Sequence, residues 1–88
     1  MKTVRLENLD YSLTKTGLVE ILTTLGFSIT RDDIRMPHSR LSGNPRGVAF
    51  CRFATDKEAH RACNALCRFV ILGRPTCTHM ADFELESR

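Results

Sequence analysis

Tryptophan is absent from this chain of 88 residues, tyrosine occurs once, and neither sign of charge dominates. Thirteen basic against ten acidic residues leave a net charge of +3, which is too small to identify a nucleic-acid partner by itself. The longest apolar runs are only a few residues long, so we expect no segment to span a membrane. No apolar stretch follows Lys2, so we also expect no signal peptide.

Hydrophobic residues make up 42% of the chain, the share of an ordinary globular protein. We therefore expect one small domain over residues 1–81, followed by an acidic C-terminal tail over residues 82–88. The four cysteines lie within segments of regular hydrophobic spacing, and no secretory signal accompanies them. We interpret them as reduced thiols of an intracellular, reducing compartment (nucleus, cytoplasm or mitochondrial matrix) rather than as disulfides: Cys51, Cys63, Cys67 and Cys77.

Two segments have the i, i+3, i+4, i+7 spacing of an amphipathic helix face. Their apolar residues are Leu18, Ile21, Leu22 and Leu25, and Ala59, Ala62, Cys63 and Leu66. Ser12 or Thr14 is expected to cap the first helix, and Thr55 with Glu58 forms the pattern of a capping box before the second. Phe27 and Phe69 flank these helices and are predicted to be buried.

Four segments read as strands, around Val4–Leu6, Ile34–Met36, Arg46–Phe53 and Thr76–Ala81. The resulting order is βαββαβ, which predicts an α+β, ferredoxin-like fold with a four-stranded antiparallel sheet and both helices on one face. The other face of the sheet should then be polar.

The third strand contradicts that expectation of a polar face. Alternation places Ala49, Cys51 and Phe53 on one side and Phe50 on the other, beside arginines at both ends of the strand. An exposed aromatic ring between arginines is typical of a binding surface.

The same strand resembles a signature of the RNA recognition motif family. The family pattern is K/R-G-F/Y-G/A-F-V-x-F/Y, and Arg46–Phe53 (RGVAFCRF) matches six of its eight positions. The departures are Val48, where an aromatic residue is usual, and Cys51, which replaces valine. The first strand is similar to the shorter motif of the family, with Arg5 at a position that is usually aromatic.

The resemblance implies that the chain binds single-stranded RNA without catalysis and without a cofactor or small-molecule substrate. In this family unpaired bases stack on aromatic side chains of the sheet, and arginines hold the phosphates. It assigns the base stack to Phe50, phosphate contact or guanidinium stacking to the arginines, and the rest of the surface to a valine and a histidine: Phe50, Arg46, Arg5, Arg52, Val48 and His79.

Two aromatic residues outside the sheet are further candidates for RNA binding, because only one of the usual three sheet aromatics is present. Tyr11 follows the first strand, and Phe83 follows the last one. The departures also resemble the quasi-RNA-recognition motifs of splicing factors, which bind RNA through loops. Whether the sheet or the loops form the main surface is left open by the sequence.

Other functions have weaker support in the sequence. Protein–protein interaction or dimerisation on the same fold is the main alternative. No Ser/His/Asp or Cys/His spacing indicates nucleophilic catalysis, so we expect no enzyme activity. His60, Cys63 and Cys67 lie on one predicted helix, but Cys63 belongs to its apolar face, so we expect structural thiols and no metal site.

Overall fold

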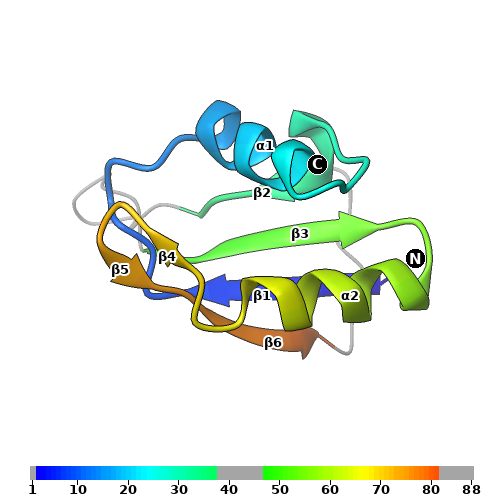
Figure 1. Ribbon diagram of the computed structural model, residues 1–88. Helices are drawn as coiled ribbons and strands as arrows, with labels where there is room; N and C mark the ends of the chain where they lie inside the picture. Colours follow the sequence, from blue (N-terminus) through cyan, green and yellow to red (C-terminus); the bar gives the residue numbers. More distant parts are fainter. Residues whose placement is uncertain (1, 38–46, 82–88) are drawn as a thin grey trace.

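The computed structural model describes residues 2–37 and 47–81, so the predicted acidic tail, Arg46 and Phe83 lie outside the described residues. Figure 1 shows the βαββαβ order that the sequence predicts, with one additional hairpin. The elements are β1 (Lys2–Glu7), α1 (Lys15–Thr24), the 3₁₀ turn η1 (Arg31–Asp33), β2 (Ile34–Arg35), β3 (Ala49–Phe53), α2 (Asp56–Leu66), β4 (Val70–Ile71), β5 (Arg74–Pro75) and β6 (Cys77–Ala81).

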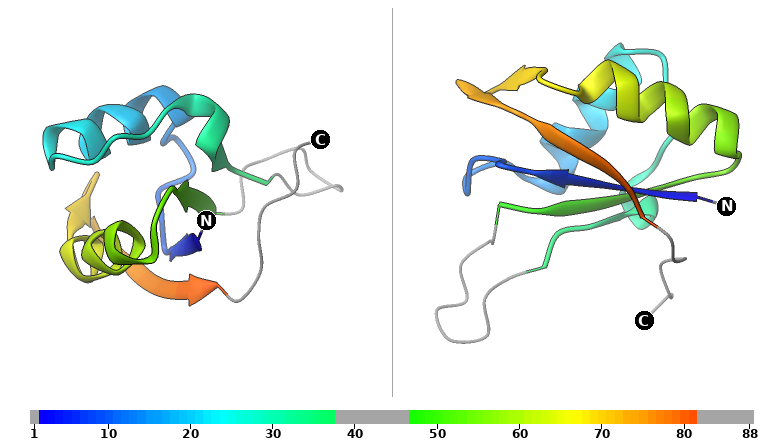
Figure 2. Two further views of the ribbon diagram at one scale, coloured as in Figure 1. Left: turned by 90° about the vertical axis from the view of Figure 1, so that its right-hand side faces the viewer. Right: turned by 90° about the horizontal axis from the view of Figure 1, so that it is seen from below.

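The main sheet has the strand order β2-β3-β1-β6, and every neighbouring pair is antiparallel. Both helices lie on one side of this sheet (Figure 2). The β2 strand at the sheet edge is only two residues long, so Met36, which we expected within it, lies just beyond its end. One face of the sheet therefore supports the helices, and the other faces away from them.

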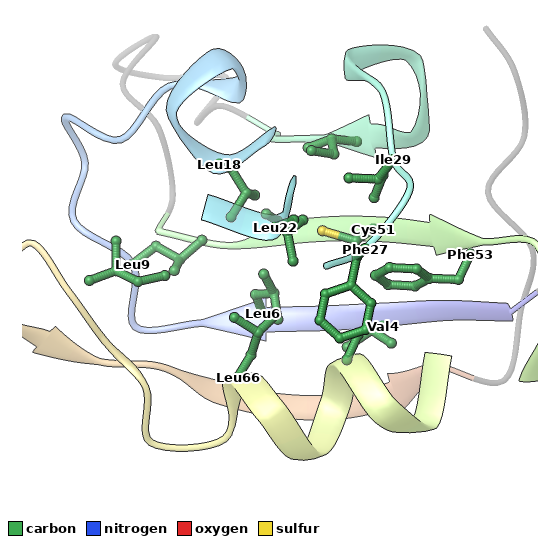
Figure 3. Packing of buried hydrophobic residues seen from close by; sticks show 14 of the residues in the cluster. Val4, Leu6, Leu9, Leu18, Leu22, Phe27, Ile29, Cys51, Phe53 and Leu66 are labelled. Carbon is green, nitrogen blue, oxygen red and sulfur yellow. The ribbon is translucent and has the colours of Figure 1, made fainter. Parts of the chain in front are cut away.

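The core lies between the sheet and the helices (Figure 3). Val4 and Leu6 of β1 are fully buried there, as are Leu18 and Leu22 of α1. Burial of an aliphatic or aromatic side chain of this size stabilises the fold by about 1.5–3 kcal/mol. The large rings of the cluster meet edge to face, with 5.9 Å between the centroids of Phe27 and Phe53, as aromatic pairs prefer.

Both helices begin at a threonine that the sequence indicated. The Thr14 side chain accepts a hydrogen bond from Gly17 N, and Thr55 accepts one from Glu58 N. Such caps satisfy a backbone donor that the helix itself leaves free. The second half of the predicted box differs, because Glu58 Oε1 accepts a hydrogen bond from Ser28 N, 3.3 Å away. That carboxylate joins α2 to the segment before η1 instead of closing its own cap.

The hairpin of β4 and β5 was not predicted. Its turn is Leu72–Gly73, and both residues have positive φ, +50° and +80°. The prediction that Phe69 is buried is wrong, because its relative exposure is 36% and it precedes this exposed hairpin. In the apolar stretch that Phe69 begins, only Ile71 is buried in the core, whereas Val70 and Leu72 are exposed.

A clamp of polar contacts ties the hairpin to the end of β1. Asn8 has a φ of +62°, and its Nδ2 donates to the Pro75 carbonyl at 2.9 Å. Arg74 donates in return to Asn8, from Nε to the backbone oxygen at 3.1 Å and from Nη2 to Oδ1 at 2.6 Å.

No helix in the described part of the chain is long and apolar enough to cross a membrane.

Candidate nucleic-acid interface

Four side chains form one row across the face of the sheet that the helices leave uncovered. Strand register pairs Arg35 with Phe50, Phe50 with Arg5, and Arg5 with His79. Side chains of directly opposed residues in antiparallel strands lie on the same face, with Cβ atoms about 4.5–5.5 Å apart. We call these four residues the central row; it runs across all four strands of the main sheet, from β2 to β6.

The orientation of the central row follows from the buried residues beside it. Val4 and Leu6 flank Arg5, Ala49 and Cys51 flank Phe50, and Ile34 precedes Arg35; the flanking residues of this set are all buried in the core. Since successive strand residues point to opposite faces, Phe50 is directed outward, where it is partly exposed. The structure thus places Phe50, Arg5 and His79 on the one face that the sequence predicted.

Arg35 is a candidate site residue that was not predicted from the sequence. It ends the short β2 strand and is exposed directly opposite Phe50. The signal was present, because Ile34 is a core residue and its neighbour in a strand must face the other way. Phe50 therefore has an arginine on each neighbouring strand, Arg35 on β2 and Arg5 on β1.

One acidic residue lies within this basic surface. Glu7 Oε1 is 3.1 Å from Arg5 Nε, and Glu7 Oε2 is 3.2 Å from His79 Nε2. The Arg5 contact is an ion pair and not a hydrogen bond, since Arg5 Nε has no hydrogen-bond partner in residues 2–37 and 47–81. The carboxylate therefore neutralises part of the positive charge of the central row.

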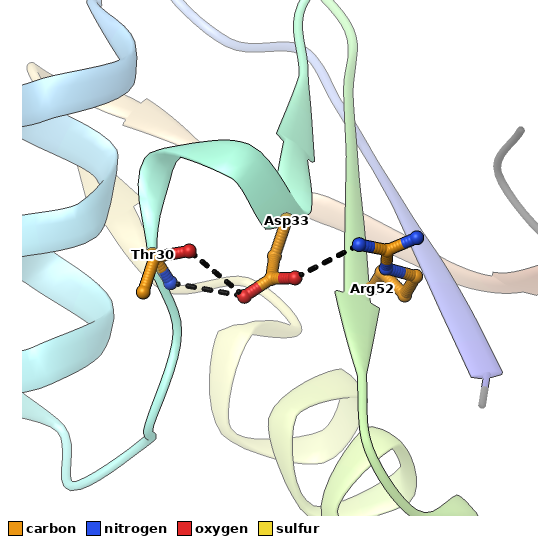
Figure 4. Close-up of polar contacts among 3 residues, drawn as sticks. All are labelled: Thr30, Asp33 and Arg52. Carbon is orange, nitrogen blue, oxygen red and sulfur yellow. Dashed lines mark hydrogen bonds and ion pairs between the residues drawn. The ribbon is translucent and has the colours of Figure 1, made fainter. Parts of the chain in front are cut away.

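Arg52, which the sequence assigned to phosphate contact, is already paired with a carboxylate. Arg52 Nη2 donates to Asp33 Oδ1 at 3.2 Å, and Asp33 Oδ2 accepts from the backbone N and the hydroxyl of Thr30, both at 3.1 Å (Figure 4). Burial raises the pKa of Asp33, but the hydrogen bonds from Thr30 and Arg52 outweigh it, so the pKa lies below its usual value. The pair fastens η1 to β3.

The residues on either side of the central row offer fewer contacts to a ligand. Register places Thr3 between Arg52 and Ala81, and Thr3 is fully buried, with an Oγ1 that has no hydrogen-bond partner among the described residues. On the other side Glu7 is opposite Cys77. Val48 is partly buried and precedes β3 rather than lying within it.

Tyr11 lies against the chain that enters β3. Leu9 N donates to the Gly47 carbonyl at 3.0 Å, which draws the segment after β1 toward Gly47. A Cβ at Gly47 would lie 3.2 Å from Tyr11 Cε1, yet the tyrosine is 65% exposed. Tyr11 is thus an exposed ring beside the sheet edge, outside the central row.

The cysteines are all free. Burial raises the pKa of the Cys51 thiol to about 12, so this thiol is unreactive at neutral pH. Cys63 is partly buried, and its Sγ donates to Thr78 Oγ1 at 3.4 Å. Cys77 is exposed, and so is Cys67, where α2 ends. Among residues 2–37 and 47–81, no group of three His, Cys, Asp or Glu residues is placed to hold a metal ion.

Comparison with known proteins gives consistent matches. The sequence matches the RNA recognition motif over residues 4–76. Mouse nucleolin is 37% identical over 73 residues, which are 83% of this chain but only 9% of nucleolin. The crystal structure of the RNA-binding protein PG1 has a TM-score of 0.82 at 24% identity, covering 98% of this chain and 100% of that one. The Sxl-lethal protein–RNA complex has a TM-score of 0.76 at 30% identity, covering 90% of this chain and 47% of that one.

Proposed function

Because this chain belongs to the RNA recognition motif family, we propose that it binds single-stranded RNA with the open face of its sheet and serves RNA processing or regulation. The family is one of RNA-binding domains and not of enzymes. The observation that carries the proposal is the central row, in which one outward-facing aromatic ring has an arginine on each side.

In this proposal one base stacks on Phe50, and the row on either side holds its neighbours. Base–aromatic stacking contributes about 1–3 kcal/mol per base. Arg5 and Arg35 contact phosphates or lay their guanidinium planes on a base, because a guanidinium group serves either purpose. His79 at the β6 end of the row stacks on or hydrogen-bonds a further base. Val48 contacts a base edge or ribose.

Contacts outside the row supplement this weakened platform, as in the quasi-type departure that the sequence suggested. Arg46 and Arg52 are proposed to hold phosphates, Arg52 after it exchanges its Asp33 partner. Tyr11 and Phe83 are proposed to stack further bases. The chain needs no cofactor for this binding, and its free thiols fit a reducing intracellular compartment.

Two relatives support RNA as the partner. The Sxl-lethal protein, at 30% identity, was solved as a complex with RNA. PG1 is described as an RNA-binding protein and has the same fold over its whole length.

The test is a titration of the isotope-labelled chain with short U-, G-, A- and C-rich RNAs, followed by amide shift perturbation. We expect the largest shifts at Arg5, Arg35, Phe50 and His79 with at least one of the RNAs, and small shifts along the exposed side of α2. Binding should weaken steeply as salt rises, because phosphate contacts release counterions. Unchanged sheet amides with all four RNAs would contradict the proposal.

Protein binding or self-association is a second candidate function, and the β4–β5 hairpin favours it. Val70 and Leu72 are 61% and 60% exposed, and Leu72 has a positive φ that Asn or Gly adopts more easily. A bulky apolar residue at a strained, exposed turn is expected where it anchors a partner. The Leu72→Asn variant should then lose the partner or the dimer while RNA affinity is unchanged. Contact through the hairpin would also persist at high salt.

A further inference from the structure

We propose a second nucleotide site beyond the sheet, in a groove of about 380 Å³ between the β1–α1 connection and η1. This inference rests on the proposed RNA-binding function and extends it from the open face around the β2 edge. We call this site the edge groove. Its walls combine an exposed ring, apolar side chains and two cations: Tyr11, Leu13, Lys15, Arg31 and Met36.

The cations of the edge groove are available to a ligand. Neither Lys15 nor Arg31 belongs to any ion pair found among the described residues. The same two side chains also line an adjoining depression, in which Asp32 is the only acidic residue among those that the structure describes. Carboxylates are absent from the lining of the groove itself within the part of the chain described. A phosphate is the anion that such a site recognises in a chain already argued to bind RNA.

The apolar side of the groove suits a base or a ribose. Tyr11 is 65% exposed and its ring lines the groove. Leu13 is buried beneath, and Met36 is partly buried against the core. The volume falls at the lower end of the range of about 300–1,000 Å³ that ligand pockets occupy. One nucleotide, with its base on Tyr11 and its phosphate between Lys15 and Arg31, matches this combination of surfaces.

The groove is continuous with the central row along the chain. Arg35 ends the row at β2, which is the edge strand of the main sheet, and the next residue, Met36, lines the groove. Tyr11 in turn lies against Gly47, two residues before β3. An RNA strand that leaves the row past Arg35 therefore meets the edge groove directly. The occupant we infer is the continuation of the same RNA strand.

The test compares two lengths of RNA, using whichever base composition binds best. We compare a tetranucleotide, which the central row alone accommodates, with a dodecanucleotide of the same composition. The Lys15→Ala/Arg31→Ala variant should lose about tenfold affinity for the dodecanucleotide, because two phosphate contacts are removed. Its affinity for the tetranucleotide should be unchanged. The matched control is Lys57→Ala/Arg68→Ala, which removes two exposed cations elsewhere.

Tyr11 supplies an independent readout. Tyr11→Ala should weaken dodecanucleotide binding about fivefold or more, and Tyr11→Phe should restore it, since stacking needs the ring and not the hydroxyl. Amide shifts at Leu13, Lys15 and Arg31 should appear with the dodecanucleotide but not with the tetranucleotide.

The outcomes separate the two proposals. If the tetranucleotide shifts the central row but both charge variants bind the dodecanucleotide equally, the edge groove is refuted and the sheet function stands. If only the groove amides shift, the groove is supported and the sheet platform is refuted. If an acidic peptide shifts the groove amides but neither RNA does, the edge groove is refuted as an RNA site. If neither RNA shifts any amide, both proposals are refuted.

Discussion

The central row and the edge groove differ in how their cations are held. On the sheet, Arg5 is next to Glu7, and Arg52 of the neighbouring register pair is bound to Asp33. In the groove, Lys15 and Arg31 have no such partner among the described residues. On the sheet, the ring of Phe50 lies within the row of cations, whereas in the edge groove the ring of Tyr11 forms one wall.

The difference teaches that a count of arginines overstates the attraction of a surface for RNA. An exposed ion pair contributes only about 0–1 kcal/mol, so a phosphate can replace the carboxylate, but part of the gain is lost in the exchange. Lys15 and Arg31 of the edge groove have no carboxylate partner among the described residues to exchange, so a phosphate gains their full attraction. We therefore expect stacking to dominate on the sheet and charge to dominate in the groove.

The largest effect should come from removing the sheet aromatic. Phe50→Ala is expected to lower RNA affinity about 5- to 150-fold, which corresponds to about 1–3 kcal/mol of lost stacking. Direct titration measures the loss, and Phe50→Tyr should keep most of the affinity. The matched control is Phe69→Ala, which removes a partly exposed ring outside both surfaces. Equal losses in Phe50→Ala and Phe69→Ala would end the case for a sheet platform.

The next effect concerns the glycine that joins the two surfaces. Gly47 has a φ of +75°, and an added Cβ would lie 2.9 Å from the Leu9 carbonyl oxygen. Gly47→Ala should therefore lower the free energy of unfolding by about 2 kcal/mol, through strain and the backbone clash together. Gly26→Ala is the matched control, since Gly26 has a φ of +94° but open space around its Cβ position.

Urea denaturation of the two glycine variants checks this prediction. Gly26→Ala should cost only the strain, about 1 kcal/mol. If Gly47→Ala were no worse than Gly26→Ala, the close approach of the Tyr11 segment to β3 would not matter for stability.

A smaller effect, with the opposite sign, is expected at Glu7. Glu7→Gln removes the anion next to Arg5 and His79, so RNA affinity should rise about two- to fivefold. The dependence of affinity on salt should also become steeper, since Arg5 is then available to a phosphate. Titrations at several salt concentrations measure both quantities. Asp56→Asn removes a carboxylate on α2 and should change neither; a loss of affinity in Glu7→Gln would show that the carboxylate assists binding.

The smallest effect is a pH dependence of stability at Asp33. Its pKa is lower in the folded state, so its contribution is present above the unfolded pKa of about 3.9 and is lost as the pH falls through the folded value. Asp33→Asn should cost about 1 kcal/mol at pH 7, and the difference from the parent chain should shrink at pH 3. Urea denaturation at both pH values tests this. Asp32→Asn, which removes the exposed neighbouring carboxylate, is the matched control.

The fold could be predicted well because its signals are local and agree with one another. The spacing of apolar residues gave both helices, and the alternation in Ala49–Phe53 gave the orientation of the third strand correctly. The β4–β5 hairpin could not be predicted, because Leu72 adopts a backbone conformation that its residue type disfavours. The exposure of Phe69 could not be predicted either, since only the path of the chain decides which apolar residues face the core.

The candidate site was predictable in its residues but not in its pairing. Alternation is a property of each strand and placed Phe50, Arg5 and His79 on one face. The position of Arg35 opposite Phe50 depends on the strand register, which no single residue indicates. The ion pairs of Glu7 and Asp33 depend on side-chain distances across strands. The edge groove joins segments that most of α1 separates in the sequence.

The clamp between Asn8 and Arg74 connects the sheet face proposed to bind RNA with the β4–β5 hairpin proposed to bind protein. Asn8 directly follows β1, the strand that carries Arg5 and Glu7, and it is bonded to both residues of β5. A partner protein that binds the exposed hairpin would therefore also restrain the end of β1, the strand on which the RNA is proposed to lie. Any coupling free energy transmitted through this joint is reciprocal: RNA that orders β1 would prepare the hairpin for its partner by the same amount.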